Sequence, residues 1–179
     1  MEQKVKMLTM QNARVHAQIA DAIRKHIRLL GHFGFGVTEL RVFDPRPMGA
    51  CADSKNDAVR LCLEMEGKTS GIYIGVQPRP VHLFDLAPNC WKPAHSGPDG
   101  NCASDRDIEY ITSLFFDIDV VSNERAEGHP ASDEELAQSL RAAQLLSREE
   151  GLAMGSTICC SGNGHYVLVP IVPIPVYSD

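Results

Sequence analysis

Two aspartates stand two residues apart in the segment Leu114–Val120, whose other residues are all hydrophobic. The segment is typical of a buried strand. Because strand side chains alternate between faces, Asp117 and Asp119 share one face, while Phe116 and Ile118 fill the other. Their Cα atoms are expected roughly 6.5–7 Å apart, and two carboxylates at this spacing can hold two divalent cations about 3.5–4 Å apart, as in two-metal phosphoryl-transfer sites. The alternative is a solvated strand end or a turn cap, which would not need so many flanking hydrophobic residues.

A second motif, Ser161–Tyr166, reads Ser-Gly-Asn-Gly-His-Tyr and lies between two apolar segments. Asn-Gly between strands favours a tight hairpin turn, and a plain turn is the alternative for this segment taken alone. Two glycines also expose backbone N–H groups, which can bind phosphate oxygens. The turn presents the hydroxyl of Ser161, the imidazole of His165 and the phenol of Tyr166. Metal-bound triphosphate needs both acidic ligands and a phosphate-binding turn, so the two motifs together favour nucleotide chemistry.

The composition suits one globular domain over residues 1–179, with an N-terminal helical segment (1–36) and an α/β core (37–179). The chain is 44% hydrophobic and carries a formal charge of −6. No apolar run approaches the roughly 20 residues of a membrane span, and the N-terminus lacks the apolar region of a signal peptide, so we expect a cytoplasmic protein without a membrane partner. The six cysteines are then reduced thiols or metal ligands. Residues 1–60 have a formal net charge of +4 and residues 61–179 one of −10. Such a distribution suits a protein that binds phosphates on one side.

Apolar periodicity and punctuation by glycine and proline predict alternating helices and strands. In the first helix, Val15, Ile19, Ile23 and Ile27 are expected on one face. Ser132 and Glu135 form a capping box that starts a later helix. The pattern indicates an α/β or α+β fold, with a mixed sheet and flanking helices. The predicted helices cover residues 13–30, 54–66 and 132–150, and the predicted strands cover 37–43, 71–77, 114–120, 156–160 and 166–172, with an irregular segment over 85–105.

The acidic strand followed by Ser161–Gly164 resembles the first two motifs of the archaeo-eukaryotic primase superfamily, and most closely the primase-polymerase domains of phages, plasmids and mobile elements. Three earlier segments resemble elements of that family in the same order. Thr38–Val42 is similar to an early strand, Gly71–Pro80 to a second strand, and Ala103–Ile108 to the segment before the metal-binding strand. The resemblance covers most of the chain from about residue 37, and it implies a catalytic core with an RRM-like palm.

The resemblance also implies the roles of the site residues. Asp117 and Asp119 would hold two Mg²⁺ or Mn²⁺ ions, and a primer 3′-hydroxyl would attack the α-phosphate of a nucleoside triphosphate opposite a single-stranded DNA template. Arg79 is a candidate phosphate or template contact, with a surface role beside two prolines as its alternative. A helicase domain or subunit would be a further partner in DNA replication. The expected contacts to the nucleotide triphosphate are Ser161, Gly162, Asn163, Gly164, His165 and Tyr166.

Two departures from the family pattern bear on activity. The family commonly places its histidine at the position of Tyr166, whereas here it stands one residue earlier, at His165. Adjacent strand residues face opposite ways, so either the turn shifts register or Tyr166 takes over the contact. The family also needs a third carboxylate on a later strand, and the terminal Asp179 is a poor candidate. We therefore expect a truncated chain, one part of a longer primase or a degenerate relative, with weak or no catalysis by this chain alone.

Other functions stay open on the sequence. The first is a non-catalytic module of the same fold, which binds DNA or nucleotide in replication initiation. The second is the ferredoxin-like palm of nucleotide cyclases, although the turn motif usual in those enzymes does not occur here. Zinc bound by Cys90, His95 and Cys102, with His82 as a fourth ligand, is also considered, but no Cys-x-x-Cys pair anchors such a site.

Overall fold

The computed structural model describes residues 2–95, 102–120, 129–152 and 155–177, with side chains from Arg14 onward. Its contacts divide the chain into two compact units. Unit 1 comprises Met1–Tyr110 together with Pro175–Asp179, and unit 2 comprises Ile111–Ile174. The prediction of a single domain over residues 1–179 stays a prediction.

The fold is α+β, which is one of the two predicted classes. The predicted mixed sheet is wrong. The described strands form two separate antiparallel sheets, one of four strands and one of three. The physical reason lies in the connections. Strands joined by tight turns pair antiparallel, whereas parallel pairing needs a long crossover. Residues 43–47 join the first two strands, and Ser161–Gly164 join the last two.

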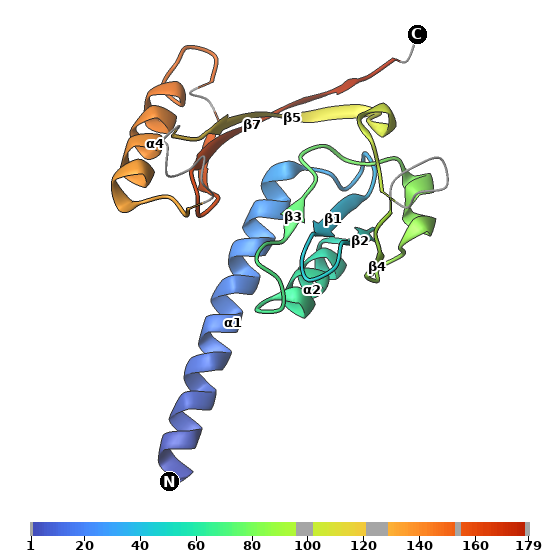
Figure 1. Cartoon of the computed structure of the whole chain (residues 1–179). Helices are drawn as coiled ribbons and strands as arrows, with labels where there is room; N and C mark the ends of the chain where they lie inside the picture. Colours follow the sequence, from blue (N-terminus) through green and yellow to red (C-terminus); the bar gives the residue numbers. More distant parts are fainter. Residues whose placement is uncertain (1, 96–101, 121–128, 153–154, 178–179) are drawn as a thin grey trace. The chain divides into compact units, whose positions relative to one another are not determined.

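Unit 1 consists of a four-stranded sheet in the order β3-β1-β2-β4 with two helices (Figure 1). Side chains alternate along each strand, so Leu40, Ala50 and Ala52 point to the face that is packed against the helices. Helix α2 begins at the N-cap Ser54, whose hydroxyl accepts a hydrogen bond from the Asp57 backbone N–H at 3.1 Å. The elements are α1 (Glu2–Leu30), β1 (Thr38–Val42), β2 (Met48–Ala52), α2 (Lys55–Met65), β3 (Tyr73–Ile74) and β4 (Lys92–Pro93).

The buried stripe of α1 differs from the predicted one. Val15 is 46% exposed, and the residues that pack into the core are instead Ala20, Ile23, Ile27 and Leu30. These lie at steps of three, four and three residues, which is one face of a helix. The predicted helical spacing of the apolar residues is confirmed, but the buried face begins at Ala20 rather than at Val15.

Three further elements of unit 1 differ from the prediction. Strand β2 was not predicted, because its sequence Met-Gly-Ala-Cys-Ala has little of the β-branched character that marks strands. The predicted strand over residues 71–77 shrinks to β3, and the predicted irregular segment contains β4. Two short 3₁₀ helices, η1 (Val81–Leu86) and η2 (Asp105–Asp107), lie before and after β4.

Unit 2 contains a three-stranded sheet in the order β5-β7-β6, with helix α4 on one face. The predicted capping box of α4 is confirmed, since Ser132 and Glu135 bond reciprocally. Phe116 and Ile118 of β5 pack with Val167 of β7 against Ala143 of this helix, as the alternation along β5 predicts. The elements are β5 (Tyr110–Ile118), α4 (Asp133–Leu146), β6 (Thr157–Cys160) and β7 (His165–Pro175).

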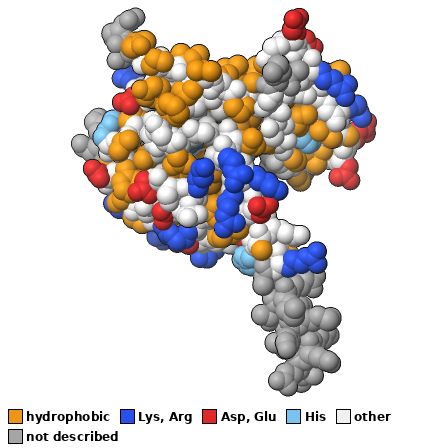
Figure 2. Space-filling model, turned by 180° about the vertical axis from the view of Figure 1, so that it is seen from behind, with side chains coloured by type: hydrophobic (Ala, Val, Ile, Leu, Met, Phe, Trp, Pro, Cys, Tyr) orange, Lys and Arg blue, Asp and Glu red, His pale blue; other side chains and the backbone are white. Residues whose placement is uncertain are grey.

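Within the residues that the structure describes, no helix is both long and apolar enough to cross a lipid bilayer. Figure 2 shows Lys and Arg side chains in small groups on the surface, with Asp and Glu side chains scattered among them.

Candidate functional site

The acidic strand places both predicted metal ligands on the free face of the unit 2 sheet. Asp117 lies in β5 and Asp119 directly follows its last residue, Ile118. Both carboxylates are exposed, whereas Phe116 and Ile118 alternate with them and pack on the α4 side. None of the ion pairs among the described residues includes either aspartate. Two neighbouring carboxylates without a cationic side chain repel each other, and a bound cation would relieve that repulsion.

The hairpin between β6 and β7 is closed by Ser161 and Gly164. The Ser161 N–H and hydroxyl both donate to the Gly164 carbonyl, at 3.0 Å and 3.2 Å. Gly162 adopts a φ of 91°, a left-handed conformation that favours glycine. The Asn163 N–H points to the Ser161 hydroxyl and the Gly162 N–H to the Cys160 sulfur, each at 3.4 Å. The contact to the Ser161 hydroxyl is long, and a thiol sulfur is a weak acceptor, so a phosphate oxygen would compete well for both N–H groups.

Gly164 brings the two motifs together. A Cβ atom built on Gly164 would overlap the Asp119 carboxylate and would lie 2.9 Å from the Ile118 carbonyl oxygen. Only a residue without a side chain therefore fits between the turn and the end of the acidic strand. The structure places the glycine hairpin directly against Asp119.

The two residues after Gly164 lie on opposite faces of the sheet. His165 faces α4, because its Nδ1 lies 2.8 Å from the hydroxyl of Ser139 on that helix. Tyr166 lies on the other face, where its ring centroid is 5.1 Å from that of Phe115 and where Asp117 adds to its electrostatic environment. Of the two candidates for the nucleotide contact, Tyr166 is the one that shares a face with the aspartates.

Tyr166 is a neutral hydrogen-bonding group at physiological pH. Burial, together with the thiol of Cys159 and the charge of Asp117, raises the pKa of its phenol far above the ordinary value. Cys159 pairs with Tyr166 across the β6–β7 ladder, and the two side chains share a hydrogen bond. Burial also raises the pKa of the Cys159 thiol. The acidic face therefore carries two carboxylates, a phenol, a thiol and the exposed ring of Phe115.

The hydrogen bond between His165 and Ser139 indicates which ring nitrogen of His165 carries the proton. Ser139 is 1% exposed, and its hydroxyl donates to the Leu136 carbonyl at 3.0 Å. The single hydroxyl proton is thereby used, so the serine oxygen must accept from an N–H on Nδ1 of His165. In the neutral ring the lone pair then lies on Nε2. Sequence reasoning missed Ser139, because a serine in a helix gives no signal of its partner.

Arg79 lies in unit 1, where it takes part in an ion cluster. Its Nε donates to Oε2 of Glu39 at 3.2 Å, and Arg41 donates from Nε and Nη2 to the other oxygen, at 2.9 Å and 2.7 Å. The side chains of Glu39 and Arg79 are 5% and 13% exposed, so the surface role considered for Arg79 is wrong. The Glu39 and Arg41 side chains were not predicted, although their alternation with Leu40 in β1 would have placed both on one face.

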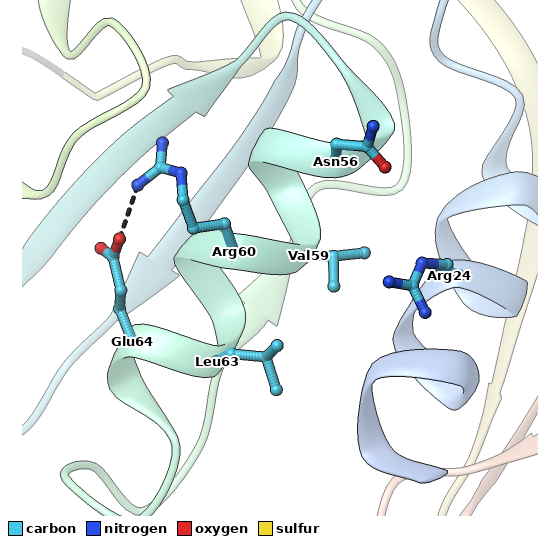
Figure 3. Close-up of a pocket in the computed structure, with 6 residues that line it drawn as sticks. All are labelled: Arg24, Asn56, Val59, Arg60, Leu63 and Glu64. Carbon is cyan, nitrogen blue, oxygen red and sulfur yellow. Dashed lines mark hydrogen bonds and ion pairs between the residues drawn. The ribbon is translucent and has the colours of Figure 1, made fainter. Parts of the chain in front are cut away.

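Two cavities of unit 1 bear on the site. One, of about 150 Å³, is lined by the ion cluster together with Tyr73, Ile74 and Gly75. A larger one, of about 470 Å³, lies between α1 and α2 and contains none of the predicted site residues (Figure 3). Its lining residues are Arg24, Asn56, Val59, Arg60, Leu63 and Glu64.

The candidate zinc ligands Cys90, His95, Cys102 and His82 form no cluster. Across the described parts of the chain, no three or more His, Cys, Asp or Glu side chains are grouped so that they could hold a metal ion. All six cysteines are free thiols. The two aspartates of unit 2 thus stand as a pair, without a third such ligand among these residues.

Comparison of the chain with family models, with curated proteins and with solved structures finds no match.

Proposed function

We propose that this chain is the nucleotide-binding part of a primase-polymerase, a nucleotidyltransferase of the archaeo-eukaryotic primase type that acts in DNA replication. The observation that carries the proposal is the contact of Gly164 with Asp119. It brings two aspartates, which form no ion pair among the described residues, and a glycine hairpin together on one sheet face. Such a face offers carboxylates to metal ions and backbone N–H groups to phosphates, which are the two requirements of a metal-bound triphosphate.

The acidic pair fits Mg²⁺ or Mn²⁺, which bind hard oxygen ligands and are commonly held by one or two carboxylates together with substrate phosphates. Bound there, these ions would polarise the α-phosphate and stabilise the charge that develops on it. Asp117 and Asp119 orient their oxygens from one strand face, and the hairpin holds the triphosphate next to them. Tyr166 is a neutral phenol whose proton bonds to Cys159, so it would exchange that hydrogen bond for one to the nucleotide.

The reaction would join a 3′-hydroxyl oxygen to the α-phosphorus and break the bond to the β-phosphate, which leaves as pyrophosphate. The proposed substrates are nucleoside triphosphates and a single-stranded DNA template, with a helicase as a further partner in the cytoplasm. Arg79 is a proposed phosphate contact. His165 holds its place through Ser139, and on this geometry it acts on the α4 side of the sheet rather than beside the carboxylates.

The test is calorimetric titration of ATP and dATP, each with Mn²⁺, into the full chain and into the variant with Asp117→Asn and Asp119→Asn. We expect metal-dependent binding by the native chain and its loss in the variant. The matched control, Asp85→Asn with Glu149→Gln, removes two exposed carboxylates elsewhere and should bind as the native chain does. Equal binding by all three proteins would contradict the proposal.

A second candidate function is a non-catalytic module of the same fold that binds nucleotide or DNA in replication initiation. It is favoured by the absence, among the described residues, of a third carboxylate near the aspartates. It predicts metal-dependent nucleotide binding without primer synthesis. A primer-extension assay on a single-stranded template, carried out on the same chain, separates the two candidates.

A further inference from the structure

The face of the unit 1 sheet that points away from the helices carries a buried carboxylate between two guanidinium groups, and the backbone of Ala103 and Ser104 covers part of it. Glu39 and Arg41 alternate with the core residue Leu40 along β1, so they point away from the helices. Arg79 reaches the same carboxylate from the segment after β3. Its own backbone is fixed, because its N–H and carbonyl both bond to Val37, at 2.9 Å and 2.8 Å. The two cationic side chains are therefore held in place before any ligand arrives.

The cluster has more cationic than anionic charge. Glu39 Oε1 also accepts the Ala103 N–H at 3.0 Å, so both carboxylate oxygens are used. Arg41 Nη2 donates further to the Ala103 carbonyl, and Arg79 Nη1 to the Ser104 carbonyl at 3.4 Å. Arg41 Nη1 and Arg79 Nη2 take part in none of these bonds. One guanidinium would suffice to neutralise Glu39. The Asp107 carboxylate lies near Arg79 without forming an ion pair with it, and Arg41 is 29% exposed, so an anion can reach the second guanidinium from solvent.

A cavity of about 150 Å³ opens beside these guanidinium groups. This volume corresponds to about five water molecules, which is room for a phosphate group rather than for a whole nucleotide. Gly75 lines the cavity next to Arg79, whose Nε would lie 3.8 Å from a Cβ at that position, an ordinary van der Waals contact. The site thus has the size for one phosphate, and it offers two guanidinium groups that share a single ion-paired carboxylate.

Two exposed aromatic rings stand next to the cavity. Tyr73 lines it and pairs with Arg41 in the ladder between β1 and β3. The ring of Phe43 meets that of Tyr73 edge-on at a centroid distance of 4.9 Å, and the two residues are 55% and 56% exposed. Exposed rings beside arginines are the usual means of stacking a nucleobase whose phosphate is held electrostatically.

We propose that Arg41 and Arg79, locked by Glu39, form a phosphate site in unit 1, and that Tyr73 stacks the base of the nucleotide that carries this phosphate. The ligand is either a free nucleotide or a nucleotide within a single strand. The inference extends the phosphate contact proposed above for Arg79, but it needs neither the aspartates of unit 2 nor a divalent cation.

The negative charge of the nearby Asp107 should weaken the binding of a phosphate by Arg41 and Arg79. Its carboxylate accepts the Ser104 N–H at 2.6 Å and the Ser104 hydroxyl at 2.8 Å, and Arg79 and His82 contribute to lowering its pKa. Among the described residues, it forms no ion pair with either guanidinium. Asp107→Asn should therefore strengthen anion binding.

The test is titration of the full chain with inorganic phosphate, AMP and a short oligothymidylate, in the presence of EDTA so that the acidic site contributes nothing. We expect AMP to bind more tightly than inorganic phosphate. Arg41→Gln should weaken AMP at least about tenfold, the loss of a charge-assisted hydrogen bond. Because Arg41→Gln could disturb the cluster, Tyr73→Ala provides a second test at an exposed residue: it should weaken AMP but not inorganic phosphate. Arg148→Gln, an exposed change on unit 2, is the control.

The outcomes separate this inference from the proposed function. Binding in EDTA that survives Asp117→Asn with Asp119→Asn, but is lost in Arg41→Gln, supports the unit 1 site whatever the fate of the acidic site. Much tighter, more salt-sensitive binding of the oligothymidylate identifies a strand as the source of the phosphate, and preference for AMP identifies a free nucleotide. AMP binding that is unchanged in both Arg41→Gln and Tyr73→Ala, or that appears only with Mn²⁺, overturns the inference.

Discussion

The two sheets of this chain use their free faces in opposite ways. In unit 1 the free face holds a carboxylate that is 5% exposed and bonded to two guanidinium groups. In unit 2 the free face holds two exposed carboxylates that have no cationic side chain beside them among the described residues. Each sheet has helices on its other face, so the difference comes from the polar residues that alternate with the core positions.

The comparison shows how burial decides what a charge does. A buried charge must be compensated within the protein, so the Glu39 cluster contributes to stability and is already organised for a ligand. An exposed pair of like charges needs no internal partner, and it can hold a cation at little cost to the fold. Removing the charge of Glu39 should therefore destabilise unit 1, whereas removing the charges of Asp117 and Asp119 should affect only binding by unit 2.

The largest effect is expected from Glu39→Gln. This change leaves two guanidinium groups without their carboxylate, and it should lower the free energy of unfolding by about 3 kcal/mol or more. The measurement is urea denaturation. Glu64→Gln is the matched control, since its exposed pair with Arg60 should contribute less than about 1 kcal/mol.

The corresponding change in unit 2, Asp117→Asn with Asp119→Asn, removes mutual repulsion and should not lower stability. A loss of stability there as large as that of Glu39→Gln would break the comparison.

A second test uses pH, because unit 1 buries a histidine. His32 is fully buried, with Nδ1 3.0 Å from the Thr38 hydroxyl and Nε2 2.9 Å from the Val76 carbonyl, and burial lowers its pKa to about 4. The unfolded chain takes up this proton near pH 6.5, before the folded chain does. The stability contribution is therefore complete above pH 6.5 and is lost as the pH falls toward 4. At pH 5 the loss should be about 2 kcal/mol.

Urea unfolding of the native chain and of His32→Gln at pH 7.5 and pH 5 checks this expectation. The variant should show a much smaller difference between the two pH values. His26, whose pKa burial also lowers, acts in the same direction, so part of the difference should remain in His32→Gln and disappear when His26→Gln is added. The carboxylates of unit 1 with lowered pKa values lose their contribution only below about 3.8, outside this range. An equal pH dependence in the native chain and in His32→Gln would contradict the assignment.

The acidic face and the hairpin of unit 2 could be predicted from the sequence, because each depends on local rules. Alternation along a strand placed Asp117 opposite Phe116, and Asn-Gly gave the turn. The contact of Gly164 with Asp119 could not be derived from composition or spacing, since it depends on the pairing of strands that are distant in the sequence.

The site in unit 1 was largely missed for a related reason. Arg79 was singled out, but its partner Glu39 lies 40 residues earlier, and a Glu-x-Arg strand by itself indicates only a polar face. The small residues of β2 gave no strand signal either. Local pattern therefore predicts which face a residue occupies, whereas the partner across a sheet comes from tertiary packing.

Gly164→Ala sharpens the comparison from the side of unit 2. The added methyl group would meet the Asp119 carboxylate and the Ile118 carbonyl, so the hairpin must shift away from the acidic strand. We expect a loss of about 1–2 kcal/mol in stability, as for other overpacked sites, together with loss of Mn²⁺-dependent nucleotide binding. Gly71→Ala is the control for stability alone, because its Cβ would lie 3.4 Å from the exposed ring of Tyr73, which can move but belongs to the site proposed in unit 1. Normal nucleotide binding by Gly164→Ala would separate the hairpin from the acidic site.

The smallest effect is expected from Ser139→Ala, which tests why His165 lies away from the carboxylates. The change removes the acceptor of the Nδ1 proton at a buried position, so stability should fall by about 1 kcal/mol. Ser147→Ala, whose hydroxyl donates to the Gln144 carbonyl at the end of the same helix, is the matched control.

The decisive measurement for Ser139→Ala is the ¹⁵N spectrum of His165. In the native chain it should show a proton on Nδ1, and in the variant the preference for that tautomer should weaken. If Ser139 only positions His165 on the α4 side, Mn²⁺-dependent nucleotide binding should persist in Ser139→Ala while Tyr166→Phe reduces it. The reverse result would mean that His165 reaches the nucleotide from the helix side of the sheet, and the division between a packed face and a binding face in unit 2 would no longer hold.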